Sequence, residues 1–333
     1  MAEMKESRTA LGVAWMRAIH QVLDSKPLIL EDAPIVELLG RYYVERASKA
    51  TERFQAPGAR LLRSHVVLRS RFTEDRLEQS LARGIEQFVI LGAGYDTFFA
   101  RQPEWAKSLR IFEIDQPATQ SDKLARIAAA RMPVPPNVVF GSVNFESESV
   151  ADGLRRHGVR FDVPTVFSWL GVTMYLTEPA IDATLNTVLS FPRGSEIVLT
   201  FTSRERAQEF STLGYPEQVP PGARPASATA AAPGPTASTP SSAAPAASTP
   251  SADPGLTGGT PPPVGATLAA VVAAIGEPWI TFYEPDEIER KLHHAGFSST
   301  LLVTPQMAHD LYFAGRPDEL PTPRRASVIS ATV

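Results

Sequence analysis

Hydrophobic positions follow two different periodicities, and the change comes near residue 84. In the first part they recur at helical spacing, as at Leu11, Trp15 and Ile19. Similar patterns predict a second helix around residues 38–43 and a third over 59–83, ended by Gly84. No glycine turn or strand alternation interrupts this part, so residues 1–84 are expected to form an N-terminal helical cap.

Beyond residue 85, short apolar runs alternate with helical patterns. The runs predict strands at 87–92, 110–114, 137–143, 164–169 and 195–202. A helix is expected at 286–295, followed by apolar runs at 299–303 and 326–333 that give two further strands. This alternation is typical of an α/β fold with a mainly parallel sheet and helices on both faces.

One segment, residues 220–263, interrupts this core. It consists mostly of Ala, Pro, Ser, Thr and Gly, has no aromatic residue, and carries only two charges, Arg224 and Asp253. Such a segment cannot bury enough apolar surface to offset its ordering entropy, so it is predicted to be disordered. It divides the α/β core into 85–219 and 264–333. A tolerated surface insertion is one interpretation, and a lid or a tether for a partner is the other.

Composition narrows the classes of function. The net charge of −4 over 333 residues offers no basic surface for nucleic acid. The absence of cysteine excludes disulfides, thiolate nucleophiles and cysteine zinc sites. The first residues are polar, and no apolar run reaches 18 residues. We expect a cytoplasmic protein with no membrane partner, and the oligomeric state stays open.

The clearest chemical signal is a glycine turn after the first predicted strand. The run Phe88–Leu91 enters Gly92, Ala93 and Gly94, and Asp115 ends the next strand 21 residues after Gly94. In α/β nucleotide folds an acid at this distance binds a ribose diol. The turn and the acid together predict an adenosine-type cofactor.

The residues around the turn indicate which cofactor this is. A dinucleotide fingerprint has a small third residue, but Thr97 stands there, and no Lys follows to make a phosphate loop. S-adenosyl-L-methionine has no phosphate and fits better. An NAD(P)-dependent oxidoreductase and a cofactor-binding scaffold without catalysis remain alternatives.

Several separated motifs carry a resemblance to a known family. They are Ser7–Leu11, Arg17–His20, Arg69–Arg71, Ile90–Thr97, Phe112–Pro117, Trp169–Leu176, Gly276–Trp279 and Tyr312–Arg316. The chain resembles the bacterial S-adenosylmethionine-dependent methyltransferases related to leucine carboxyl methyltransferase. The resemblance implies a class I, Rossmann-like fold of seven strands, the last two forming an antiparallel pair at the sheet edge.

The resemblance also implies roles for cofactor-binding residues. Arg69 matches the position that binds the cofactor's carboxylate, with Arg71 as a neighbouring substitute and Arg17 as a weaker candidate. Asn144 stands where relatives usually carry an Asp that binds the adenine amino group, and Phe145 would pack on the ring. The glycine turn would contact the methionine part. Asp96 either caps the following helix, which its residue type favours, or binds a water near the cofactor's amino group.

At the acceptor end, Leu170 stands where leucine carboxyl methyltransferases hold an acid. This departure argues against transfer to a protein C-terminus and favours O-methylation, at a carboxyl or a hydroxyl, of a small molecule. Trp169 and Tyr175 belong either to this pocket or to the core. The histidines show no metal-ligand spacing, so no metal is expected, and His65 is a weak candidate for a general base. No catalytic residue is assigned.

The composition of residues 220–263 gives a first testable prediction. Limited proteolysis should cut within this segment while the flanking parts stay intact, because an unfolded Pro- and Ala-rich segment is open to proteases. Replacing it with a short Gly/Ser linker should change the melting temperature by only about a few degrees. A protease-resistant segment would contradict the prediction of disorder.

Overall fold

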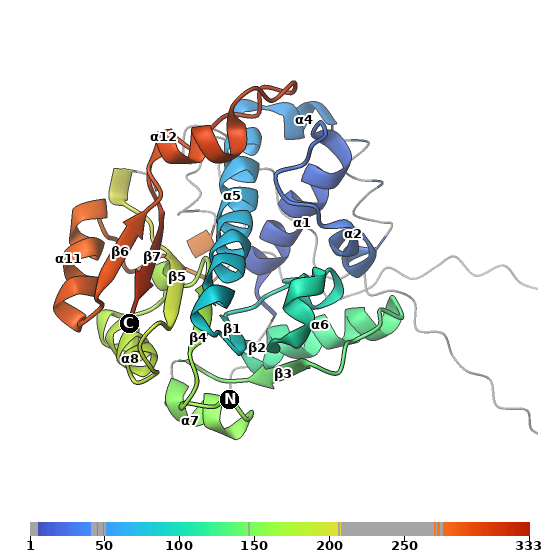
Figure 1. Ribbon diagram of the computed structural model, residues 1–333. Coiled ribbons are helices and arrows are strands. Elements are labelled where there is room, and N and C mark those ends of the chain that lie inside the picture. The colour runs from blue at the N-terminus through green and yellow to red at the C-terminus, as the bar shows by residue number, and fades with distance from the viewer. Residues whose placement is uncertain are drawn as a thin grey trace, which may run out of the picture.

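A seven-stranded sheet forms the centre of the computed structural model, which describes residues 6–40, 45, 49, 51–145, 147–205, 207, 270, 272–273 and 276–333. The strands are β1 (Gln87–Leu91), β2 (Arg110–Asp115), β3 (Val138–Ser142), β4 (Thr165–Trp169), β5 (Glu196–Thr200), β6 (Ser299–Leu302) and β7 (Val328–Thr332). Their order is β3-β2-β1-β4-β5-β7-β6 (Figure 1). The pairs from β3 to β5 are parallel, and β7 runs antiparallel to both β5 and β6. The predicted α/β sheet with an antiparallel edge pair is confirmed.

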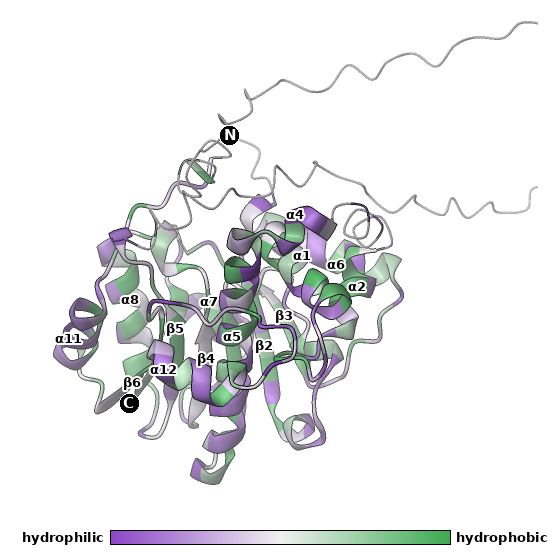
Figure 2. Cartoon of the chain, turned by 90° about the horizontal axis from the view of Figure 1, so that it is seen from above, coloured by the Kyte–Doolittle hydropathy of each residue, from purple (hydrophilic) through white to green (hydrophobic). Residues whose placement is uncertain are grey.

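Helices cover both faces of this sheet. They are α1 (Arg8–Leu23), α2 (Ala33–Leu39), α4 (Thr51–Gln55), α5 (Pro57–Ser80), α6 (Pro117–Ala129), α7 (Val150–Arg156), α8 (Glu178–Leu189), α11 (Pro285–Ala295) and α12 (Pro305–Ala308). Short helical turns are η1 (Leu81–Arg83), η2 (Phe98–Ala100), η3 (Glu104–Ser108), η4 (Thr173–Tyr175) and the π-helical η5 (His309–Phe313). In Figure 2 the strands carry mostly hydrophobic residues, whereas α11 consists largely of hydrophilic ones.

Strand alternation assigns the core residues to the two faces. Val89 and Leu91 pack in one cluster with residues of α7, α8 and α11. Phe88 and Ile90, on the opposite face, pack with Leu77 near the end of α5. Successive side chains of a strand point to opposite faces, so each strand contributes to both layers.

The described residues between 8 and 80 are mostly helical, as the sequence predicts, and α5 covers one face of the sheet. This 24-residue helix begins at a proline, and Gly84, with φ 77°, ends the short η1 turn that follows it. Val67 and Phe72 of α5 pack with Val198 of β5, and α5 crosses the front of the sheet in Figure 1. We keep the division into 1–84, 85–219, 220–263 and 264–333 as a proposal about organisation.

Some sequence predictions fall on residues that are not described. The predicted insert 220–263 lies wholly outside the described residues, and so does the part of the predicted second helix around residues 42–43. Among the described helices, none is long and apolar enough to span a membrane.

A fully buried ion pair lies between the sheet and α6. Lys123 of α6 contacts the Glu113 carboxylate of β2, and both side chains are inaccessible to solvent. The Lys123 ammonium also lies 5.7 Å from the ring centres of Phe99 and Phe140. Burial raises the pKa of Glu113 to about 7, although Lys123 opposes the shift. Each charge therefore depends on the other for compensation.

This pair gives a stability prediction. Lys123→Met should lower the free energy of unfolding by about 3–5 kcal/mol, because it leaves the Glu113 carboxylate buried without a counterion. Adding Glu113→Leu should restore the stability to the wild-type value or above. Urea unfolding of the two variants measures both effects. A single variant as stable as the wild type would show that the charges are not coupled.

Candidate functional site

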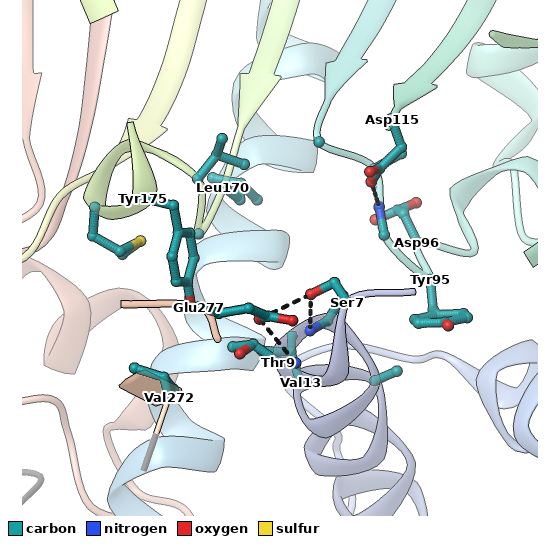
Figure 3. Close-up of a pocket in the computed structure, with 18 of the residues that line it drawn as sticks. Ser7, Thr9, Val13, Tyr95, Asp96, Asp115, Leu170, Tyr175, Val272 and Glu277 are labelled. Atoms are coloured by element: carbon teal, nitrogen blue, oxygen red, sulfur yellow. Dashed lines mark hydrogen bonds between the residues drawn. The ribbon is translucent and has the colours of Figure 1, made fainter. Parts of the chain in front are cut away.

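A cavity of about 520 Å³ lies at the carboxyl ends of the central strands. It opens where β1 and β4 lie side by side and the strand order reverses, the place where open α/β sheets bind ligands. Its walls come from the turns after β1, β2, β3 and β4, from one face of α5, from the first turn of α1 and from residues 276–280 (Figure 3).

The glycine turn after β1 forms one wall. Gly92 has φ 68° and Gly94 has φ 52°, conformations that favour glycine. The N–H groups of Gly92 and Ala93 both donate to the Ile114 carbonyl, at 2.8 and 3.1 Å, which ties the turn to β2. A β-carbon on Gly92 would collide with the Val172 side chain, which lies against the turn. The absence of a side chain at Gly92 therefore allows Val172 to pack directly against the turn.

Asp115 lies at the end of β2, beside this turn. Its two carboxylate oxygens accept hydrogen bonds from the N–H groups of Gly94 and Gln116, the latter at 2.7 Å. Burial raises the pKa of Asp115 above its usual value, while these bonds and Lys123 act in the opposite direction. A carboxylate has about four acceptor sites, so the fixed group can still accept two hydroxyl hydrogens.

The structure separates the two candidate arginines of α5. Arg69 lines the cavity and is only 9% exposed. Arg71 points away from it and pairs with Asp75, its side chain 45% exposed. Burial lowers the pKa of Arg69 to about 10, which leaves it cationic at neutral pH. No described carboxylate lies within ion-pair distance of it, so an anionic ligand group would complete its surroundings.

Arg17 also lines the cavity, but its guanidinium is already engaged. It pairs with buried Asp32, with Nε to Oδ2 at 2.8 Å, and donates to the Tyr95 carbonyl at 3.2 Å and to Thr97 Oγ1 at 2.6 Å. The arrangement holds the glycine turn against α1. Arg17 is thus a support of the turn and a poor candidate for the ligand's carboxylate.

Asp96 is buried among cations beneath the same turn. Its carboxylate accepts from the Phe98 N–H at 2.7 Å, at the start of the η2 turn, whose N-cap residue is Thr97. Burial acts to raise the pKa of Asp96, but the charges of Arg17, Arg101 and Lys123 outweigh it and hold the pKa below the usual range.

The comparisons with known proteins agree with this geometry. A sequence profile of leucine carboxyl methyltransferases matches residues 10–189, more than half of the 333 residues. The chain belongs to the leucine carboxyl methyltransferase family. The members of this family are methyltransferases, so the oxidoreductase alternative no longer applies. The cofactor is S-adenosyl-L-methionine.

Similar proteins support the family. YktD of Bacillus subtilis, provisionally named an S-adenosyl-L-methionine-dependent methyltransferase, is 26% identical over 341 residues, which cover 96% of this chain and 95% of YktD. A Streptomyces coelicolor protein of the same provisional name is 30% identical over 152 residues, or 45% of this chain and 53% of that protein. The crystal structure of a DUF574 family protein from Streptomyces avermitilis, 14% identical, has a TM-score of 0.51 with 96% of both chains covered. This last likeness shows the common fold.

The residues that the family resemblance implied are brought together, with one exception. Arg69, Gly92, Ala93, Gly94, Asp115, Asn144, Phe145, Leu170 and Tyr175 all line the cavity. Trp169 does not, and its placement in the pocket is corrected here. It is fully buried and packs with Phe167 in the core on the other face of the sheet. Because strand residues alternate, Ser168 and Leu170 face the cavity and Trp169 cannot.

His65 also lies in the cavity wall, one helical turn from Arg69 on α5. Its Nδ1 lies 3.2 Å from Ser327 Oγ, a contact between groups 262 residues apart in the chain. The position keeps His65 within reach of a ligand.

Sequence reasoning missed the contact that brings residue 277 to the start of the chain. The Glu277 carboxylate accepts from Ser7 Oγ at 3.2 Å and from the N–H groups of Arg8 and Thr9 at 2.9 and 3.3 Å (Figure 3). These donors belong to the first turn of α1, where an anion is favourable. Gly276–Trp279 is one of the motifs shared with the methyltransferase family, and that was its only signal in the sequence.

The position of Asp115 gives a prediction for the family's cofactor. Asp115→Ala should weaken the binding of S-adenosylmethionine by about 2–4 kcal/mol, because two charge-assisted hydrogen bonds to the ribose would be lost. Calorimetry measures the affinity. Asp162→Ala, which removes a carboxylate 75% exposed on the surface, is the control and should leave it unchanged. An unaltered dissociation constant in the Asp115 variant would assign the ribose to another acid.

Proposed function

We propose that this chain is an S-adenosylmethionine-dependent O-methyltransferase that acts on a small, partly apolar molecule. The observation that carries the proposal is the presence of Leu170 in the cavity wall, where leucine carboxyl methyltransferases hold an acid. An apolar side chain there changes what the acceptor end can bind, while the cofactor end keeps its polar groups.

At the end of the cavity formed by the glycine turn and Asp115, each part of S-adenosylmethionine has a matching residue. Asp115 would bind the ribose, Asn144 the adenine amino group, and Phe145 the adenine ring. The turn at 92–94 would contact the methionine part, with Arg69 on its carboxylate. When bound, S-adenosylmethionine supplies a sulfonium methyl group with a good leaving group. The described residues fit this cofactor, because Asp115 keeps free acceptor sites at the cavity wall and Arg69 has no described carboxylate within ion-pair distance.

The remaining cavity suits an apolar acceptor. Leu62 of α5 packs with Val272 and Trp279 in a small apolar cluster at the cavity wall. Met174 and Ile280 line the same cavity, and the backbone N–H of Ile280 donates to the Met174 carbonyl at 2.8 Å. Pockets of this kind bind small molecules through apolar surface and use a few polar groups for orientation.

The protein's part in such a reaction is chiefly alignment. Holding the acceptor oxygen in line with the methyl group, away from water, supplies much of the rate. A carboxylate acceptor needs no base. A hydroxyl acceptor needs one within hydrogen-bond reach, and His65 is the histidine that lines the cavity.

The direct test is transfer of labelled methyl groups from the cofactor into a metabolite extract. A labelled small molecule supports the proposal, and release of labelled methanol in alkali identifies a methyl ester, whereas an ether is stable. Cofactor binding without transfer to any extract fraction would instead favour the non-catalytic scaffold.

A substitution at Leu170 provides a second prediction. Leu170→Arg should abolish acceptor turnover while cofactor affinity changes by less than about threefold, because the new charge fills the acceptor end without touching the ribose contacts. Leu124→Arg, at a site on α6 that is 40% exposed, is the control. The wild type should not methylate a peptide ending in leucine. Equal losses of affinity and turnover, or no loss of either, would remove Leu170 from the acceptor site.

A further inference from the structure

His65 is a buried histidine in the cavity wall, and its ring is attached to the sheet. It lies on α5 one helical turn after Leu62 and one before Arg69, and all three line the cavity. The residue is only 7% exposed, and its Nδ1 lies 3.2 Å from Oγ of Ser327, which is also buried. Ser327 directly precedes β7, and its carbonyl accepts from the Phe201 N–H at 3.0 Å. The start of β7 therefore holds the imidazole in place.

The strand order separates this position from the cofactor residues. Because β7 is antiparallel to β5, its first residue lies at the edge of the sheet where β5 ends. Along that edge the order is the glycine turn after β1, Leu170 after β4, Thr202 after β5 and Ser327 before β7. Neighbouring strands are about 4.8 Å apart, and β7 is three positions from β1. His65 is therefore anchored beyond Leu170, on the side of the cavity assigned to the acceptor.

The charges around the cavity favour a neutral acceptor over a carboxylate. Among the described residues that line it, the lysine and arginine side chains are Arg17 and Arg69. Arg17 is paired with Asp32, and the proposed function assigns Arg69 to the cofactor. Apolar lining side chains include Leu62, Val66, Leu170 and Met174. A second carboxylate would enter without a cation to receive it, whereas a hydroxyl on an apolar ring suits both the wall and the imidazole.

The basicity of an imidazole limits which hydroxyl it can deprotonate. Its ordinary pKa is about 6.5, against about 10 for the phenol of tyrosine and about 15.7 for water. Proton transfer from a phenol to histidine is uphill by a few units, whereas an aliphatic alcohol resembles water and is too weak an acid. The Ser327 hydroxyl can accept from the Nδ1–H of His65, and that tautomer carries a lone pair on Nε2.

We propose that His65 is the general base and that the methyl acceptor is a phenol or enol on an apolar ring, with Ser327 as the positioning residue. The acceptor's hydroxyl proton moves to Nε2 of His65, and an electron pair of the oxygen forms the bond to the methyl carbon. The bond between carbon and sulfur breaks with its electron pair left on sulfur, which gives a neutral thioether. The imidazolium then releases its proton to water. This assignment rests on the proposed function and commits it to a hydroxyl acceptor.

The test uses three acceptor probes: 7-hydroxycoumarin, its more acidic 3-cyano derivative and coumarin-3-carboxylic acid. His65→Asn should lower kcat for 7-hydroxycoumarin about 10²–10⁴-fold, the usual contribution of a positioned base. At about pH 8 it should lower kcat for the cyano derivative less than about threefold, because that hydroxyl is already ionised. His309→Asn is the matched control, since Nδ1 of this exposed histidine lies 3.2 Å from Thr322 Oγ1, and it should change neither rate.

A spectroscopic readout separates a base from a residue that only supports the wall. In a complex with S-adenosylhomocysteine, which cannot react, the wild type should ionise bound 7-hydroxycoumarin at a lower pH than the free dye. The excitation spectrum of the dye measures this shift, and His65→Asn should abolish it. Ser327→Ala should reduce both the shift and kcat in part, and Ser327→Thr, which keeps a hydroxyl, should restore them.

Several results would overturn the assignment of His65. They are methyl transfer to the carboxylic acid alone or to none of the probes, and equal losses for both coumarins in His65→Asn. An alkali-labile methyl ester as the product from the labelled extract would also overturn it, while the proposed function would stand. If the extract receives no label at all, the proposed function itself has failed.

Discussion

The buried contact between Arg17 and Asp32 is the constraint on which the cavity depends. It joins α1, the segment before α2 and the glycine turn after β1, because Arg17 also donates to Tyr95 and Thr97. Thr97 Oγ1 in turn donates to Asp32, so the carboxylate is satisfied from two sides. In a water-excluded site, removing one member would leave the other charge uncompensated. The cap and the sheet are therefore held together at the same place where the ligand cavity forms.

This arrangement shows how Arg17 and Arg69, which both line the cavity, differ among the described residues. Arg101 is held by Glu74, with two contacts at 2.8 and 2.6 Å, and Arg17 by Asp32. Arg69 is buried on α5, and no carboxylate in the described part of the chain lies within ion-pair distance of it. A cation in this state costs desolvation energy that an anionic ligand can offset. The Arg17–Asp32 pair thus holds the glycine turn in place. Arg69, close to the turn, is the cation that a ligand carboxylate would bind.

The cavity is completed by parts of the chain that are distant in sequence. The first turn of α1 and residues 276–280 meet through Glu277, and both contribute to the wall. The fold and the family together define a methyl-transfer site, but a fold of this class hosts many acceptors. In this chain the apolar side chains of Leu170, Met174 and Leu62 line the same cavity.

The sequence by itself determined the features that rest on local spacing. Strand β1, the turn at Gly92–Gly94 and the acid at Asp115 follow from the periodicity of apolar residues and from a fixed distance along the chain. Those signals lie within about 30 residues, and backbone geometry alone relates them. The strands and the helix α11 were predicted for the same reason.

Only the tertiary structure decided which neighbouring side chains share a surface. Arg69 faces the cavity and Arg71 faces solvent, and Leu170 lines the cavity while Trp169 enters the core. The direction of a side chain depends on the rotation of its helix or strand against the rest of the molecule, and residue types do not encode that rotation. The contact of Glu277 with α1 joins residues about 270 positions apart. No periodicity or motif spacing extends over such a distance, because packing of the whole core brings these residues together.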